Sequence, residues 1–296
     1  MKKAFIQLHI AIILAGFTGV FGKLITLNEG MLVWYRMILT AVLLLIILKF
    51  TNRFKLISLP DFKKIGLMGF LLSLHWIFFY GSIKYSNISV GVVCFSLTGF
   101  FTAILAPLFN RKKVIISELV LSSLTLAGIV LIFSFDSQYR TGIVLGIISS
   151  LFAATYTIFQ ERITRQYDSG TITIYQMVGG ALGMTALMPI YMHFFPVSTL
   201  VPSTLDMVYL FLLSLFCTVF LYILSTQALK HISAFTVNLS FNLEPIYSII
   251  LAMLIYKENR ELTPPFYLGL SLIILSVVLQ MVKVYRQNRN ALPLAG

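Results

Sequence analysis

Residues 83–106 read IKYSNISVGVVCFSLTGFFTAILA, and residues 229–252 read LKHISAFTVNLSFNLEPIYSIILA. At this offset of 146 positions, both stretches begin with a Lys in second place and share five identical apolar positions: Phe95, Leu97, Ile104, Leu105 and Ala106 match Phe241, Leu243, Ile250, Leu251 and Ala252. At an offset of 140, Tyr35-Arg36-Met37 matches Tyr175-Gln176-Met177. The chain therefore contains an internal repeat.

Ten apolar runs are long enough to cross a membrane as helices, since about 17–25 residues span the hydrocarbon layer. Five lie in residues 1–140 and five in residues 141–296, at 4–26, 31–48, 64–83, 87–109, 115–135, 141–160, 171–193, 206–229, 233–256 and 265–284. Because five is odd, the second half must enter the membrane from the opposite side. Inverted repeats of this kind are typical of secondary transporters, which bind substrate between the halves near the bilayer midplane. We expect an all-α membrane protein with ten transmembrane helices in two inverted five-helix repeats, 1–140 and 141–296, forming one integral membrane domain.

Composition and charge support a membrane protein. Apolar residues make up 58% of the 296 residues, charged residues 11%, and the mean hydropathy is +0.93. If the N-terminus is cytoplasmic, sixteen Lys and Arg lie in inner segments and four in outer ones, so the positive-inside rule predicts that both termini are cytoplasmic. The same distribution accounts for the net charge of +12 without nucleic-acid binding. We expect a multi-pass protein of the cell (inner) membrane whose surroundings are the lipid bilayer.

Several short motifs point to a family. The first run contains the Gly-rich stretch LAGFTGVFGK, residues 14–23, which ends at Lys23. Trp34-Tyr35-Arg36 lies early in the second run. The ninth run contains Leu243-Glu244-Pro245 and ends at Tyr256-Lys257-Glu258. With these features each half resembles the EamA repeat of the drug/metabolite transporter (DMT) superfamily. The first half departs from the pattern, with Gly99 aligned to Pro245 and Lys112 to Glu258.

The resemblance implies a mechanism and a range of substrates. In such transporters the two halves rock around a central cavity, while the fifth and tenth helices support the bundle. The family's substrates include amino acids, other metabolites and drugs, and most are exported. The resemblance does not identify the solute, the direction of transport or the coupling ion.

Glu244 is the main candidate for a functional group, because a charge at mid-depth in the membrane is costly and needs a reason. Pro245 follows it and should interrupt the helix and free a backbone carbonyl near Phe241. Asn238 and Asn242 precede it in the same run. We interpret Asn238, Asn242 and Glu244 as substrate-binding candidates and Glu244 as a candidate for proton coupling. The alternative is an acid that only fixes helix packing.

Further candidates lie in the first half. The guanidinium of Arg36 stays charged, so it must pair, reach water or bind an anionic group, and its arm is long enough to reach Glu244. His75, Trp76 and Tyr80 lie in the third run, where Trp76 and Tyr80 share a helix face and predict one wall of a cavity. A packed aromatic cluster is the alternative. Ser96 and Thr98 align with Asn242 and Glu244, although such hydroxyls often bond to their own helix.

Residues near the span ends are interpreted more simply. Lys23 is expected to reach the outer headgroup region, with a place beside Arg36 as the alternative. Gln160 and Gln176, near the inner ends of the sixth and seventh runs, are expected to be interfacial, with a place in the lining of the inner mouth as the alternative. The spacings Gly142-x-x-x-Gly146 and Gly179-x-x-x-Gly183 permit close helix packing.

These observations favour a secondary transporter that exports a small amino acid-like or drug-like solute by alternating access, with Glu244 as the candidate for proton coupling. A non-transporting sensor or assembly subunit and an intramembrane enzyme are the alternatives. The chain has no phosphate-binding Gly-x-x-x-x-Gly-Lys-Ser/Thr motif, no His-Glu-x-x-His motif and no Asp within a predicted span, so we expect no enzymatic activity, no cofactor and no metal site. The sequence does not predict an oligomeric state.

Overall fold

The computed structural model describes residues 2–111, 113–134, 139–195, 199–241, 243–260 and 262–290. Across these residues the ordered elements are helical and no strand occurs. The first half contains α1 (Lys2–Leu24), α2 (Glu29–Phe50), α3 (Leu59–Lys84), α4 (Ile88–Phe95), α5 (Leu97–Asn110) and α6 (Ile116–Ser134). The second contains α7 (Arg140–Ile163), α8 (Ser169–Phe194), α9 (Thr204–Ser214), the π-helix η2 (Leu215–Phe220), α10 (Leu221–Leu229), α11 (Ala234–Phe241), α12 (Glu244–Tyr256), the 3₁₀ turn η3 (Glu258–Arg260) and α13 (Pro264–Asn290).

In the described ranges, seven helical segments are long and apolar enough to cross a membrane, and three further apolar helices are shorter. The long ones include Ile88–Asn110, which combines α4 and α5, and Thr204–Leu229, which combines α9, η2 and α10. The shorter ones are Ile116–Ile132, Glu244–Tyr256 and Pro264–Ser276. These segments coincide with the ten predicted runs to within a few residues at most ends. The protein is therefore an all-helical, multi-pass membrane protein, while ten membrane crossings and the inverted relation of its halves stay predictions.

Polar side chains cap several helices where the sequence supplies them. Asn28, Ser58, Asn87, Asp168 and Ser203 each accept a hydrogen bond from a backbone N–H in the first turn of the helix that follows. Such caps satisfy donors that have no partner inside the helix. They define where α2, α3, α4, α8 and α9 begin.

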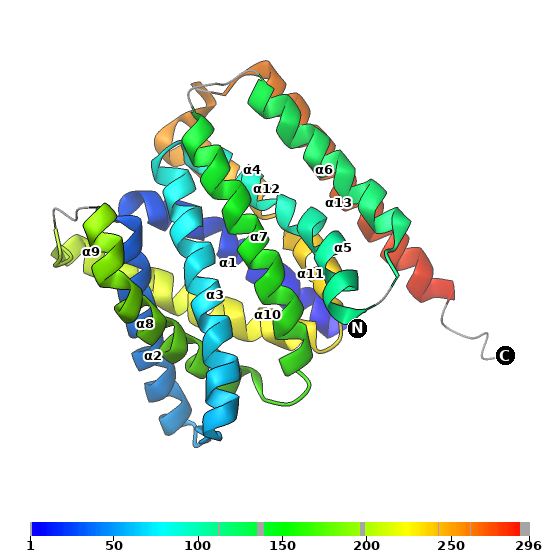
Figure 1. The fold of residues 1–296 in the computed structure, drawn as a ribbon. Coiled ribbons are helices and arrows are strands. Elements are labelled where there is room, and N and C mark those ends of the chain that lie inside the picture. Colours follow the sequence, from blue (N-terminus) through cyan, green and yellow to red (C-terminus); the bar gives the residue numbers. More distant parts are fainter. Residues whose placement is uncertain are drawn as a thin grey trace.

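Helices from the two halves pack against one another through the middle of the bundle. α3 lies against α7 and α8, α1 against α10 and α12, and α4 against α12. The crossing of α3 and α8 is close because Gly66 faces Gly179, a glycine of the predicted small-residue pair. α6 and α13 pack side by side at the edge of the bundle (Figure 1).

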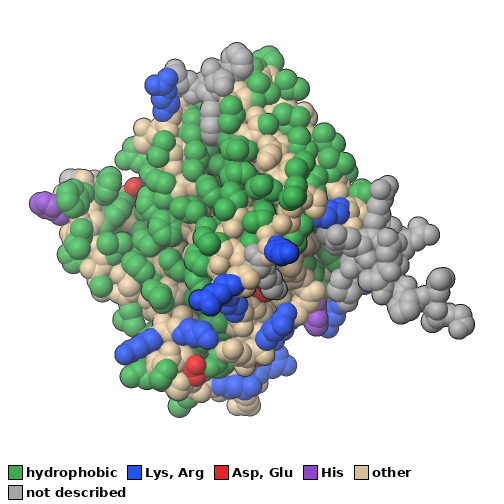
Figure 2. Space-filling model, turned by 45° about the vertical axis from the view of Figure 1, so that its right-hand side comes forward, with side chains coloured by type: hydrophobic (Ala, Val, Ile, Leu, Met, Phe, Trp, Pro, Cys, Tyr) green, Lys and Arg blue, Asp and Glu red, His purple; other side chains and the backbone are tan. Residues whose placement is uncertain are grey.

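The outer surface suits a lipid environment. Large apolar side chains such as Ile46, Leu67, Val144, Leu182 and Leu254 are exposed, which would be costly in water. In Figure 2 hydrophobic side chains cover most of the visible face, and Lys and Arg gather toward its lower end. This separation of apolar and basic surface matches the charge pattern of the sequence.

Candidate functional site

A buried arginine lies at the centre of the bundle. Arg36 of α2 is 1% exposed, and its guanidinium donates three hydrogen bonds. Its Nε reaches the Thr218 hydroxyl at 2.8 Å, and its two terminal nitrogens reach the Tyr80 hydroxyl at 2.6 Å and the Cys217 carbonyl at 2.9 Å. All three acceptors are neutral. The positive charge is therefore solvated by dipoles rather than cancelled by a carboxylate in direct contact.

The π-helical segment η2 supplies two of these acceptors. The Thr218 hydroxyl also donates to the Leu213 carbonyl at 3.0 Å, while Cys217 turns its own carbonyl to Arg36. A π-turn widens the helix, changes the direction of its carbonyl groups and often occurs at functional sites. Residues 215–220 carry no sequence signal that we recognised for this turn, so the arginine's partners in the second half were not predicted.

Aromatic side chains surround Arg36. Its guanidinium lies over the Trp76 ring, 3.6 Å from the ring centroid, and Tyr222 meets the same ring edge-on at 5.7 Å between centroids. A cation over an aromatic face is attracted to the ring by about 0.5–2 kcal/mol. Trp76 therefore both packs against Arg36 and forms part of the cavity wall. The two alternatives for the aromatic residues of the third predicted run, a cavity wall and a packed cluster, both apply to it.

Glu244 lies across from this cluster at a break between two helices. α11 ends at Phe241 and α12 begins at Glu244, so the interruption predicted from Pro245 is present. The Glu244 side chain is 4% exposed. It does not form a direct ion pair with Arg36, although both side chains line the same cavity.

The charged groups and the aromatic ring line one small central cavity of about 50 Å³. Its walls come from both halves: Ala15, Thr18, Arg36, His75, Trp76, Phe79 and Phe95 from the first, and Cys217, Leu221, Tyr222, Phe241 and Glu244 from the second. It combines one basic and one acidic group with an otherwise apolar and aromatic lining. Ligand pockets usually measure about 300–1,000 Å³, so the helices must move apart before an amino acid-sized solute fits between these residues.

A second cavity of about 60 Å³ adjoins the first and shares His75, Phe95 and Tyr222 with it. Asn238 lines it and donates to the Thr102 hydroxyl at 2.8 Å. Gln160 donates to the Thr226 hydroxyl at 2.9 Å and accepts from Gln176 at 2.5 Å. Gln160 and Gln176, which were expected at the inner interface or at the inner mouth, are both buried in this polar chain, and Gln160 lines the cavity.

The remaining predicted residues take different positions. Tyr80 touches Arg36 but is not part of the cavity lining. Thr98 of α5 donates to the Phe95 carbonyl at the end of α4 at 2.6 Å, so its hydroxyl bonds within its own membrane segment, the alternative given for such hydroxyls. Ser96 is buried at the break between α4 and α5, outside both cavities. Asn242 lies outside the described residues.

A charged cluster joins the two halves at the C-terminal end of α1, where Lys23 lies. Glu258, which follows α12, is 0% exposed and pairs with Lys23 at 2.9 Å. Its carboxylate also accepts from the Ile88 and Ser89 backbone N–H groups at 3.2 Å each and from the Ser89 hydroxyl at 2.8 Å. Glu258 therefore caps the start of α4 in the other half. Lys23 does not simply extend to the headgroups, as the sequence suggested.

Sequence reasoning missed Glu258 as a structural partner, although a signal was present. Lys23 is the cation that ends the first apolar run, and Glu258 is an acid directly after the ninth. An acid and a base at corresponding ends of two spans could have been paired, had the contact between α1 and α12 been known.

The chain is similar to known transporters over most of its length. The model of the EamA-like transporter family matches it twice, at residues 2–134 and 140–282. An uncharacterised transporter of Haemophilus influenzae is 26% identical over 271 residues, covering 86% of each chain, and one of Archaeoglobus fulgidus is 28% identical over 138 residues, 47% of this chain and 49% of that protein. A crystal structure with 14% sequence identity superimposes with a TM-score of 0.68, covering 97% of this chain and 99% of that one, which shows a shared fold.

Members of this family are transporters rather than enzymes, and the two matched segments together cover nearly the whole sequence. With apolar helices throughout and a buried polar site between its halves, the chain belongs to the EamA-like transporter family.

Proposed function

We propose that this protein is a secondary transporter that exports a small amino acid-like or drug-like solute through the central cavity. The observation that carries the proposal is that Arg36 and Glu244, each contributed by a different half, line the same buried cavity. Arg36 suits an anionic group of the solute, and Glu244 suits a cationic group or a proton. The aromatic walls suit an apolar side chain. A zwitterion with an apolar part satisfies all three.

The mechanism that we propose is alternating access. The Lys23–Glu258 cluster holds the halves together at one end of the bundle, whereas the central lining is made of helices from both halves that can separate. Opening the clustered end requires that Glu258 release Lys23 and the start of α4. The two ends would then open in turn around Arg36 and Glu244.

Proton coupling through Glu244 is part of the proposal. A carboxylate this far from water is costly unless compensated, and Arg36 compensates it only at a distance. Binding of a proton and binding of a cationic solute group would then compete for the same carboxylate. This competition links outward movement of solute to inward movement of protons.

The test is transport by the purified protein in lipid vesicles. Radiolabelled amino acids and small cationic drugs are presented one at a time, with and without a pH difference across the membrane. Saturable uptake that depends on the pH difference, and that Arg36→Met abolishes, supports the proposal. Absence of protein-dependent flux for the whole panel, with Arg36 intact and the protein folded, favours a sensor or assembly subunit.

Both termini are proposed to be cytoplasmic, in the cell (inner) membrane. The sixteen-to-four distribution of Lys and Arg supports this orientation. It places the Lys23–Glu258 cluster at the outer end of the bundle.

A further inference from the structure

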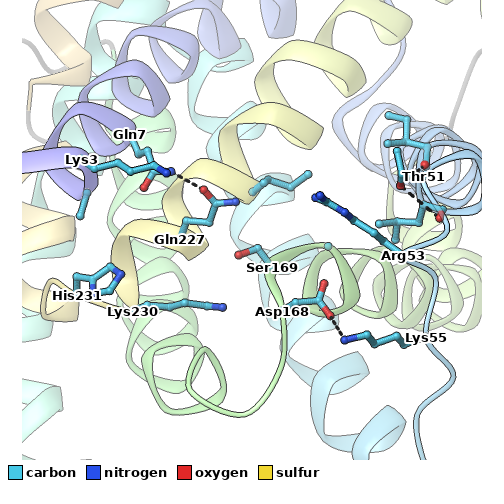
Figure 3. A pocket seen from close by; sticks show the side chains of 15 residues that line it. Lys3, Gln7, Thr51, Arg53, Lys55, Asp168, Ser169, Gln227, Lys230 and His231 are labelled. Carbon is cyan, nitrogen blue, oxygen red and sulfur yellow. Dashed lines mark hydrogen bonds and ion pairs between the residues drawn. The ribbon is translucent and has the colours of Figure 1, made fainter.

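A larger hollow lies on the face that carries Lys3, between the ends of α1, α2, α8 and α10 (Figure 3). Its volume is about 730 Å³. The charged side chains that line it are four cations and one anion: Lys3, Arg53, Lys55, Lys230 and Asp168. His231 also lines it. With His neutral, four positive charges less one negative charge leave +3 around the hollow. Such a hollow attracts anions.

Two of the cationic side chains face each other across the hollow. Arg53 and Lys230 extend into the hollow from opposite walls (Figure 3), and neither forms an ion pair within the described part of the chain. Asp168 does not cancel them. Its carboxylate accepts from the Thr171 backbone N–H at 3.0 Å and hydroxyl at 2.7 Å, and it lies 3.8 Å from Lys55.

An unpartnered hydroxyl lies between these cations. Ser169 is the first residue of α8 and is 5% exposed, yet its hydroxyl has no hydrogen-bond partner among the described residues. It lines the same hollow. A buried polar atom without a partner costs about 1–3 kcal/mol and calls for an explanation, such as a ligand that is absent here.

The backbone at this point also favours a negative charge. α8 is 26 residues long, and Ser169 and Gly170 form its N-terminal end at the wall of the hollow. Helix N-termini carry partial positive charge and present N–H groups to anions. Ile47, Leu48 and Ile223 make part of the wall apolar, and Leu48 lies against Gly170.

We propose that this hollow binds a phosphate group, with Arg53 and Lys230 as its cationic contacts and the Ser169 hydroxyl as a neutral donor. An arginine can hold a phosphate through two parallel N–H bonds, and a lysine adds a point charge. The phosphate could belong to an anionic lipid whose chains lie along the apolar wall, or to a soluble anion. The proposal does not depend on transport through the central cavity.

The experiment measures thermal unfolding of the full chain in phosphatidylcholine nanodiscs, because a ligand that binds only the folded state raises the midpoint. One arm adds inorganic phosphate, with sodium chloride at equal ionic strength as the reference. The other arm replaces part of the phosphatidylcholine with phosphatidylglycerol. The variants are Arg53→Gln, Lys230→Gln, their combination and Ser169→Ala. The matched control is Lys63→Gln with Lys64→Gln, two exposed lysines of α3 that do not line the hollow.

We expect at least one arm to stabilise the wild-type protein, and the double variant to lower the apparent affinity by at least about tenfold. Ser169→Ala should lower it less, and the control should leave it unchanged. Stabilisation by phosphatidylglycerol alone identifies a lipid headgroup, and stabilisation by inorganic phosphate identifies a soluble anion.

Three results would overturn the proposal: no stabilisation of the wild type in either arm, full stabilisation of the double variant, or equal losses in the control. The single variants keep the test decisive if the double variant folds poorly. Vesicle transport is measured separately, so failure of this site leaves the proposed transport function untouched.

Discussion

Replacing Glu258 with Gln should open the end of the bundle that the Lys23–Glu258 cluster closes. The Gln side chain has nearly the same shape, but it carries no charge for Lys23 and has one accepting oxygen in place of two. Four donors now converge on the carboxylate: Lys23, the Ile88 and Ser89 backbone N–H groups and the Ser89 hydroxyl. At least one of the buried donors would lose its partner.

The size of the effect follows from burial. Removing one partner of a buried ion pair costs about 3–5 kcal/mol, because the other charge is left uncompensated. Here Glu258 is fully buried, but the Lys23 side chain is 34% exposed and can turn toward water, so we take the lower end of that range, about 3 kcal/mol. A change of about 3 kcal/mol in the balance between closed and open ends shifts their ratio by more than about a hundredfold.

The assay uses a cysteine that is already present. Cys217 lines the central cavity and is buried, and Cys94→Ala removes the other cysteine. A membrane-impermeant maleimide is added to the side opposite the termini, and the rate of Cys217 labelling is measured. We expect Cys217 of Glu258→Gln to be labelled at least about tenfold faster than Cys217 of the wild type. This rise is smaller than the shift of more than about a hundredfold in the ratio of open to closed ends. Arg260→Gln, an exposed charge two positions further on, is the matched control and should not change the rate.

A double-substitution cycle separates the ion pair from general loosening. Lys23→Met leaves Glu258 buried without its cation, and combining Lys23→Met with Glu258→Gln should restore part of the lost closure. If Glu258→Gln is folded and labels at the wild-type rate, the cluster does not hold this end closed and the reasoning is refuted.

Four further outcomes are expected. Tags at Met1 and Gly296 should both be cytoplasmic and a tag within residues 195–206 external, and termini on opposite faces in a protease-protection assay would contradict the ten-span arrangement. Trp76→Ala should reduce transport by about tenfold or more while leaving membrane expression intact, because it removes the ring under Arg36, and Trp76→Phe should retain more activity; normal transport by Trp76→Ala would favour a packing role. Glu244→Gln should fold and exchange substrate across an equal-pH membrane but lose uphill accumulation, and unchanged pH dependence would eliminate it as the coupling residue. Because Arg36 has three neutral acceptors, we expect Glu244→Gln to lower the thermal midpoint only slightly, and a large loss that Arg36→Met reverses would indicate a stronger pairing than the contacts suggest.

The sequence by itself determined the membrane class, the helical segments and the family. Hydrocarbon requires backbone hydrogen bonds to close within each segment, so a run of apolar residues of the right length has few alternatives to a helix. Pro245 likewise predicts a helix break locally, because its ring removes a donor wherever the helix lies. Glu244 and Arg36 were identified as candidates because buried charge is costly in any surrounding structure.

Only the tertiary structure decided which polar groups meet. The partners of Arg36 come from Tyr80 and from the π-turn at Cys217 and Thr218, far away in sequence. The break at Ser96 occurs without a proline, so no local rule predicted it. The capping of α4 by Glu258 depends on helices of opposite halves lying side by side, and the burial of Gln160 depends on α8 and α10, which bring Gln176 and Thr226 to it. Local sequence determines the cost of burying a group, whereas the packing of distant helices determines which partner offsets that cost.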